Sequence, residues 1–140
     1  MSAADNKKLI QRFYDEGWNK NNLDAYDELV TEDFVDHQTL PGLPPGREGF
    51  KALNVMFKSA MPDVWVDLDW IVAQDDKAGC RWTSSGTHTG DLFGIPPTGK
   101  KVAVTATVFY RVEDGRLAEG WINRDDFGLM RQLGVIPSPE

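Results

Sequence analysis

Three segments in the first half of the chain have apolar residues at the spacing of an amphipathic helix. They are residues 5–18, a short stretch whose helix is capped by Asn22 or Asp24, and residues 50–61, whose helix is ended by Pro62. Residues 34–37 predict a short strand, and a loop rich in proline and glycine follows it. The first half is therefore predicted to be mainly helical.

The second half changes to a period of two, which is typical of strands with one buried face. Strands are predicted from about 64 to 74, 77 to 87, 102 to 112 and 117 to 124, and Asp126 is expected to cap a last short helix that ends at Gly134. Asp114 and Gly115 predict a tight hairpin between the last two strands. Helices followed by an antiparallel sheet predict a single α+β domain over residues 1–140.

The hairpin also predicts which residues share a face. If Asp114 and Gly115 alone form the loop, residues opposite each other have numbers that add up to 229. The predicted pairs on one face are Val112 with Leu117, Tyr110 with Glu119, Val108 with Trp121, Ala106 with Asn123, and Val104 with Asp125. This face is apolar in its middle, with two polar residues at one end, so a curved sheet would make it a pocket wall.

The charge of the chain narrows the choice of partners. There are 22 acidic and 15 basic side chains, which give a formal net charge of −7, and the basic ones form no cluster. We therefore expect a small, neutral or partly apolar ligand, and neither nucleic acid nor a membrane. No signal peptide is recognised, so a cytoplasmic protein is expected. The single cysteine, Cys80, excludes an intrachain disulfide framework and is expected to be a buried, inert thiol.

Two further chemistries are not favoured by the sequence. His37 and His88 are the only histidines, and no regular carboxylate spacing accompanies them, so no metal site is predicted. Residues 94–100 read G-x-x-x-x-G-K, as in a phosphate-binding loop, but two prolines remove backbone N–H donors. Lys101 also stands where that motif needs Ser or Thr, and strand sequence follows where a helix is required.

Several motifs in a fixed order resemble the SnoaL-like polyketide cyclase family. They cover nearly the whole chain and comprise Trp18-Asn19-Lys20, Leu23-Asp24, Phe34-Val35-Asp36-His37, Gly86-Thr87-His88-Thr89-Gly90, residues 94–100, Asp114-Gly115-Arg116 and residues 128–134. The resemblance implies the nuclear transport factor 2-like fold, in which a curved antiparallel sheet is closed by three N-terminal helices into a cone around an apolar cavity. It also implies cyclisation by intramolecular aldol condensation of a hydrophobic, polyketide-like carbonyl compound, without a cofactor.

The resemblance further implies which positions carry the chemistry. The characterised cyclases have a catalytic Asp eight residues after the hairpin Asp and a His six residues before it, where this chain has Ile122 and Val108. Asp36 resembles in place the catalytic base of ketosteroid isomerases and an Asn of the cyclases. A carboxylate that faces an apolar cavity is suited to remove a proton next to a carbonyl.

The candidate site residues follow from the pattern and the resemblance together. The catalytic candidates are Asp125, which the predicted pairing puts on the pocket face, together with Asp36, His37 and His88. The expected substrate-binding residues are Phe13, Tyr14, Phe57, Trp82, Val108, Tyr110, Trp121 and Asn123. Aromatic residues at such spacing also commonly fill a core, and Asp125 and Asp126 are alternatively helix caps.

Other functions on the same fold remain open at this point, because a fold does not determine a reaction. The main alternative is a binding or carrier protein without turnover, which the apolar residues at 108 and 122 favour. A ketosteroid-isomerase-like or epoxide-hydrolase-like enzyme is the other, although no Asp-Arg-Asp set is recognised on neighbouring strands. A homodimer is also expected, because an outer sheet face with Thr105, Thr107 and Phe109 needs partial cover.

Overall fold

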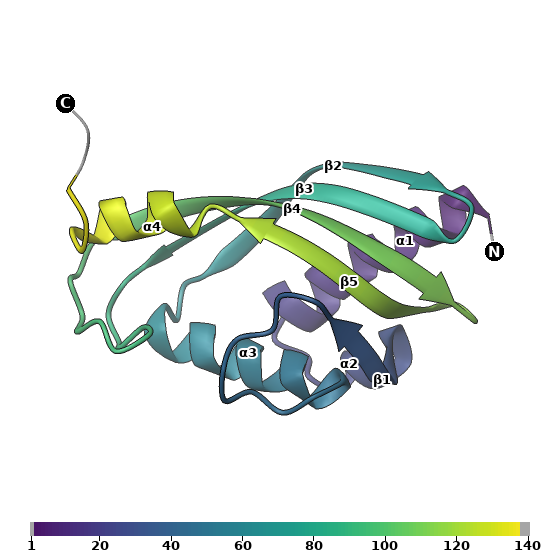
Figure 1. The fold of residues 1–140 in the computed structure, drawn as a ribbon, viewed down its shortest axis with the longest axis horizontal. Coiled ribbons are helices and arrows are strands. Elements are labelled where there is room, and N and C mark those ends of the chain that lie inside the picture. Colours follow the sequence, from purple (N-terminus) through teal and green to yellow (C-terminus); the bar gives the residue numbers. More distant parts are fainter. Residues whose placement is uncertain (1, 138–140) are drawn as a thin grey trace.

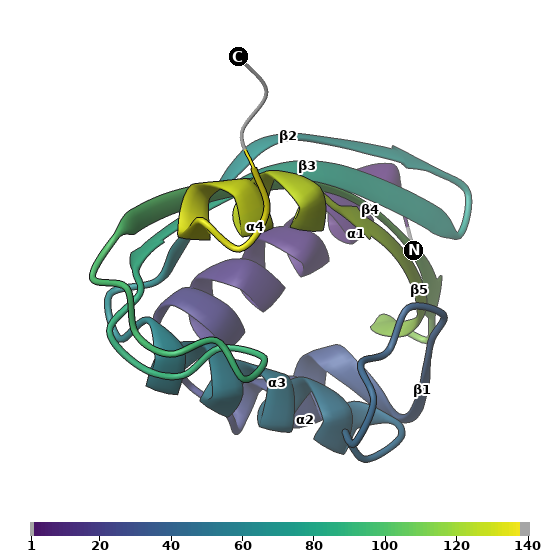
Figure 2. The ribbon, with the colours of Figure 1, turned by 60° about the vertical axis from the view of Figure 1, so that its left-hand side comes forward.

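The structure is a computed structural model that describes residues 2–137. Its elements are α1 (Ala3–Arg12), the π-helix η1 (Phe13–Asn19), α2 (Ala25–Leu29), β1 (Val30–Asp36), α3 (Arg47–Ala60), β2 (Trp65–Gln74), β3 (Lys77–Thr87), β4 (Lys101–Glu113), β5 (Arg116–Arg124) and α4 (Asp126–Leu133). The five strands form one open sheet in the order β1-β5-β4-β3-β2. The sheet curves over α1 and α3, and α4 lies at one end of it (Figures 1 and 2). The predicted α+β class is confirmed.

The first predicted helix is present but changes its winding. Ser2 and Asp5 form a capping box, in which the Ser2 hydroxyl accepts from the Asp5 N–H and the Asp5 carboxylate accepts from the Ser2 N–H. From Phe13 onward the chain forms a π-helix, in which Phe13, Tyr14 and Gly17 are all buried. Segments of this kind often occur at functional sites. Here the wider turn directs two consecutive aromatic rings into the interior.

The first strand is longer than the sequence predicted. It begins at Val30, four residues before the predicted start at residue 34, and Val30 has extended backbone angles and is fully buried. β1 pairs in parallel with β5, and Asp36 lies opposite Gly120. A β-branched residue suits a strand better than a helix end. This parallel contact, which the sequence did not reveal, brings Asp36 beside the last strand.

The β4–β5 hairpin departs from the predicted pairing after two residues. Val112 lies opposite Leu117 as predicted, but an irregularity follows, and Arg111 then pairs with Glu119. Ala118 is the extra residue on β5, which makes this a β-bulge. Every later pair is shifted by one residue, so the predicted pairing beyond Val112 is wrong. A shift of one residue moves each side chain to the opposite face.

The last helix also differs by one residue at its start. Asp125, not Asp126, is the capping residue, and its carboxylate accepts a hydrogen bond of 2.9 Å from the Gly128 N–H. Asp126 lies in the first turn, where a carboxylate complements the helix dipole. The helix ends as predicted at Gly134, which has φ of +80°.

The core lies between the concave face of the sheet and the helices, in two adjoining apolar clusters that both contact Trp18. On the outer face of the sheet, by contrast, Trp65, Trp70 and Phe109 remain about half exposed, at 50, 53 and 51%. Within residues 2–137, no helix is long and apolar enough to cross a lipid bilayer.

Candidate active site

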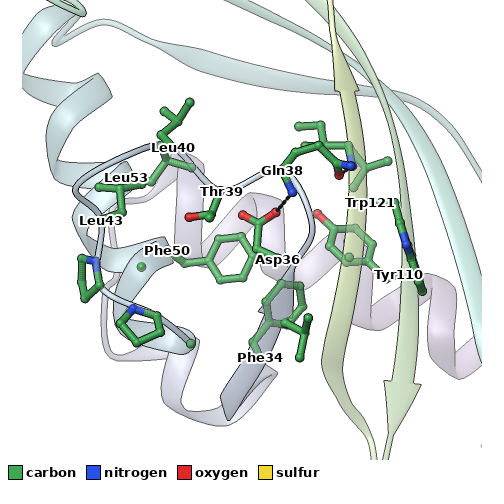
Figure 3. A pocket seen from close by; sticks show the side chains of 18 of the residues that line it. Phe34, Asp36, Gln38, Thr39, Leu40, Leu43, Phe50, Leu53, Tyr110 and Trp121 are labelled. Carbon is green, nitrogen blue, oxygen red and sulfur yellow. Dashed lines mark hydrogen bonds between the residues drawn. The ribbon is translucent and has the colours of Figure 1, made fainter.

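A hollow of about 630 Å³ opens between β1, the loop that follows it, α3 and the concave face of β4 and β5 (Figure 3). Its volume is within the range of about 300–1,000 Å³ that is typical of small-molecule sites. A smaller hollow of about 90 Å³ adjoins it deeper in the molecule. The two hollows share the lining residues Phe50, Leu53, Tyr110, Ile122 and Arg124.

Asp36 and Tyr110 approach the main hollow from either side of a glycine. Gly120 pairs with Asp36 on β1 and with Tyr110 on β4, so the three residues form one row across three strands. A Cβ atom at Gly120 would lie 2.9 Å from Phe34 Cζ and 3.2 Å from Tyr110 Cδ1. The missing side chain therefore leaves room for the Phe34 and Tyr110 rings, and Asp36 and Tyr110 both face the hollow (Figure 3).

The Asp36 carboxylate is partly buried and has one hydrogen-bond donor among the described residues. The N–H of Gln38 donates to Asp36 Oδ1 over 3.0 Å, which holds the side chain at the end of β1. Figure 3 shows the carboxylate turned toward the hollow, beside Phe50 and Thr39. One carboxylate oxygen is thus fixed, and the second has no partner within the described part of the chain.

Tyr110 belongs to a buried chain of hydrogen bonds. Trp82 Nε1 donates to the Tyr14 hydroxyl over 3.1 Å, and the hydroxyls of Tyr14 and Tyr110 are 2.6 Å apart. Burial raises the pKa of both tyrosines well above 10, with further contributions from Cys80 and, for Tyr110, from Asp36. Both phenols therefore keep their protons at physiological pH and act as hydrogen-bond donors or acceptors.

The next row of the sheet is apolar. Val108 and Ile122 lie directly opposite each other on β4 and β5, and both line the main hollow. The family resemblance implies a His and an Asp at these two positions. The bulge at Ala118 brings Val108 and Ile122 to the same row, so this part of the wall is apolar.

Arg124 lines the main hollow although it was not among the expected site residues. It lies one row beyond Val108 and Ile122, opposite Ala106, and borders both hollows. Its side chain is only 14% exposed, and Arg124 Nε donates to Asp126 Oδ1 over 2.6 Å. As the last residue of a strand it resembled a surface charge, and only the shifted register directs it inward.

Two of the expected catalytic residues lie away from the hollow. His37 follows Asp36 and points to the outer side, where its ring stacks on Trp121 at 5.0 Å and its Nε2 is 2.6 Å from Glu119 Oε2. Asp125 lines neither hollow, because its carboxylate caps α4. The expectation that it shares a face with Tyr110 is wrong, and so is the same expectation for Asn123, which is exposed on the outer face.

His88 is fully buried but also lines neither hollow. It lies just after β3, where its Nδ1 accepts a hydrogen bond of 3.2 Å from the Thr98 N–H and is 3.0 Å from the Thr98 hydroxyl. The ring thereby holds the loop before β4 against the strand that precedes it.

The remaining expected binding residues border one hollow or the other. The smaller hollow is lined by Phe13, Tyr14, Phe57 and Trp82, and the larger by Val108, while Tyr110 borders both. Trp121 also borders the larger hollow, but it pairs with Phe109 on the outer face, so the expectation that it shares a face with Tyr110 is wrong. Cys80 is buried, and burial raises the pKa of its thiol to about 12, so it is not a nucleophile at neutral pH. Among residues 2–137, no group of three or more His, Cys, Asp or Glu side chains is placed to hold a metal ion.

Comparison with known proteins identifies the family. A family model described as SnoaL-like polyketide cyclase matches residues 8–133, and the chain belongs to this family. It is 27% identical to the aklanonic acid methyl ester cyclase DauD of Streptomyces sp. (strain C5), over 94% of this chain and 84% of that protein. The corresponding cyclase DnrD of Streptomyces peucetius is also 27% identical, with 94 and 93% covered.

Solved structures agree with this assignment. TsrD from Streptomyces laurentii superimposes with a TM-score of 0.89 and 29% identity, over 97% of this chain and 99% of that one. IdmH from Streptomyces antibioticus gives a TM-score of 0.79 and 31% identity, over 91 and 97% of the two chains. The predicted family resemblance is confirmed.

Proposed function

We propose that this protein is a cofactor-independent acid/base enzyme of the polyketide-cyclase type that acts on a small, hydrophobic carbonyl compound. The observation that carries the proposal is the row formed by Asp36, Gly120 and Tyr110, which places a carboxylate and a neutral phenol at one hollow. A base and a hydrogen-bond donor are the two groups that enolisation requires.

In the proposed reaction, Asp36 takes a proton from the carbon next to a carbonyl. The electron pair of the broken C–H bond moves onto the carbonyl oxygen, and the Tyr110 hydroxyl donates a hydrogen bond to the enolate that forms. In a cyclisation, the enolate carbon then forms a C–C bond with a second carbonyl carbon of the same molecule. The proton held by Asp36 is transferred to the new alkoxide, so no atom is gained or lost.

The hydrogen-bond chain behind Tyr110 supports this role. If Trp82 donates to Tyr14 and Tyr14 donates to Tyr110, the Tyr110 hydrogen is left for the ligand. A chain oriented in this way polarises each successive hydroxyl and strengthens the last hydrogen bond. The raised pKa of Tyr110 keeps its proton in place as the donor.

The proposal is tested with 2-acetylnaphthalene, whose methyl protons are next to a ketone. Deuterium incorporation from D2O reports proton removal, and Asp36→Asn is expected to lower the enzymatic rate by about 10² or more, the scale of general-base catalysis. Asp67→Asn, at an exposed carboxylate on β2 that lines neither hollow, is the matched control and keeps the rate. Equal rates in Asp36→Asn and wild-type protein would contradict the proposal.

A second function is favoured by one observation. The facing Val108 and Ile122 remove the polar pair of the characterised cyclases, which suits a protein that binds its ligand without turnover. Tight binding of 2-acetylnaphthalene with no exchange above the buffer rate, while Asp36→Asn leaves affinity unchanged, would establish this carrier function in place of the enzyme.

We also propose that two copies pair through the outer sheet face. Trp70 and Phe109 are half exposed there, and apolar side chains of this size gain most when a partner covers them. Light scattering is expected to give about twice the chain mass of 15.7 kDa, and Phe109→Asp is expected to halve it. A single-chain mass at high micromolar concentration would contradict this expectation.

A further inference from the structure

The charges that line the main hollow are separated along it. Glu32, Asp33 and Asp36 all come from β1 and lie at one end. Arg124 lies at the other end, four residues beyond Gly120 on β5, which is about 13 Å at roughly 3.3 Å per residue. Between them the wall is the apolar pair of Val108 and Ile122. The hollow is thus negative at one end, apolar in its middle and positive at the other.

The guanidinium of Arg124 is paired on one side only. Asp126 Oδ1 accepts from Nε at 2.6 Å and Oδ2 accepts from Nη2 at 3.5 Å, whereas no described residue accepts from Nη1. The Asp126 side chain is 55% exposed and the Arg124 side chain 14%, so the anion lies in water and the cation does not. A largely buried guanidinium with free N–H groups is suited to bind a second carboxylate.

A second donor lines the smaller hollow, which Arg124 also lines. Arg124 Cζ is 5.5 Å from the centre of the Phe57 ring, and the centres of the Phe57 and Trp18 rings are 6.1 Å apart. Trp18 lines this hollow, and its Nε1 is buried without an acceptor within residues 2–137. Buried N–H groups in folded proteins are normally paired, so this end of the cavity lacks an acceptor that a ligand oxygen would supply.

We infer that Arg124 binds a carboxylate of the ligand, and that the substrate class is an extended acid with an enolisable ketone at its other end. This inference rests on the proposed function for the ketone end. The three carboxylates of β1 repel an anion and Arg124 attracts it, so the charge of the ligand sets its direction in the cavity. The apolar row at Val108 and Ile122 then holds the hydrocarbon part between the two polar ends.

The test uses three matched probes that differ at one end only: 6-acetyl-2-naphthoate, its methyl ester, and 2-acetylnaphthalene. Wild-type protein is expected to bind the acid at least about tenfold more tightly than either neutral probe, because a charge-assisted hydrogen bond contributes about 1.5–3 kcal/mol and 1.4 kcal/mol is tenfold. Arg124→Met is expected to abolish this preference and to leave affinity for 2-acetylnaphthalene within about threefold.

Two further variants separate charge from packing. Arg124→Lys keeps the charge and is expected to retain part of the preference, and Asp126→Asn removes the competing carboxylate and is expected to tighten acid binding. A wild-type protein that binds the acid no better than the ester, or an Arg124→Met variant that keeps the preference, would overturn the inference.

The two proposals fail in different measurements. Deuterium exchange into the acetyl group depends on Asp36, whereas the acid preference is a binding measurement that needs no turnover. If Arg124→Met loses the preference for the acid but wild-type protein shows no exchange, the protein is a carrier of acids and the enzyme proposal fails. If wild-type protein shows exchange but no preference for the acid, the protein is an enzyme with an uncharged substrate and the Arg124 inference fails.

Discussion

The two faces of the β4–β5 ribbon differ in chemistry although their residues alternate along the same two strands. The concave face carries Tyr110, the apolar pair of Val108 and Ile122, and Arg124, all at the hollow. The outer face carries a polar and aromatic group made up of Arg111, Glu119, Trp121 and Phe109, on which His37 stacks. Two side chains of types common in catalysis, His37 and Glu119, therefore lie outside the cavity, so residue type alone did not show which side chains face it.

The bulge at Ala118 makes this difference, so deleting Ala118 has the largest expected effect. The deletion restores the predicted pairing and turns Trp121 and Asn123 toward the core while Ile122 and Arg124 turn outward. We expect a loss of more than about 4 kcal/mol of unfolding free energy, the scale of exceptional mutations, measured by urea denaturation. A folded variant with wild-type stability would show that the register is not decisive.

A smaller but still substantial effect is expected for Gly120→Ala. The new Cβ lies too close to Phe34 and Tyr110, and overpacking of this kind costs about 1–3 kcal/mol. The added Cβ also lies 3.2 Å from Tyr110 Cδ1 and displaces the Tyr110 ring, so exchange of 2-acetylnaphthalene should fall together with the stability. Asn123→Ala, on the exposed outer face, is the control and should stay within about 0.5 kcal/mol of wild type.

Tyr110→Phe separates the donor from the base. The substitution keeps the ring but removes the hydroxyl, and with it the 2.6 Å contact to Tyr14. Exchange is expected to fall about tenfold or more, because the loss of one donor to a developing oxyanion costs at least this much. Tyr26→Phe removes a buried hydroxyl that bonds Asn54 instead, and its exchange rate should equal that of wild type. Equal rates in both variants would remove Tyr110 from the mechanism.

The smallest expected effect is that of a substitution on the outer face, Glu119→Gln, and it appears in the pH dependence of stability. Hydrogen bonds from His37 and then Arg111 lower the pKa of Glu119 from its usual 4.5. A carboxylate whose pKa is lower in the folded state stabilises the protein above its unfolded pKa, and this contribution is lost as pH falls through the folded value. Glu119→Gln should therefore flatten the decline of the urea midpoint below about pH 4.5, where this linkage operates.

Much of the fold could be predicted because its signals are local. The strand from Lys77 to Thr87 and the end of α4 at Gly134 were predicted correctly, since side-chain period and turn residues depend on neighbours in the sequence. The parallel pairing of β1 with β5 was not, because no local pattern records which strand a short segment joins.

The sequence by itself determined the α+β class, the strands with a period of two and the family resemblance, because periodicity and motif order are properties of the chain. Tertiary structure alone decided which residues meet. Tyr14 and Tyr110 bond across 96 positions, and the single unpaired residue at Ala118 reverses the direction of every side chain after it. Arg124 faces the cavity for that reason. Whether a polar side chain at a strand end faces solvent or a ligand cavity depends on the packing around it, which the sequence pattern does not show.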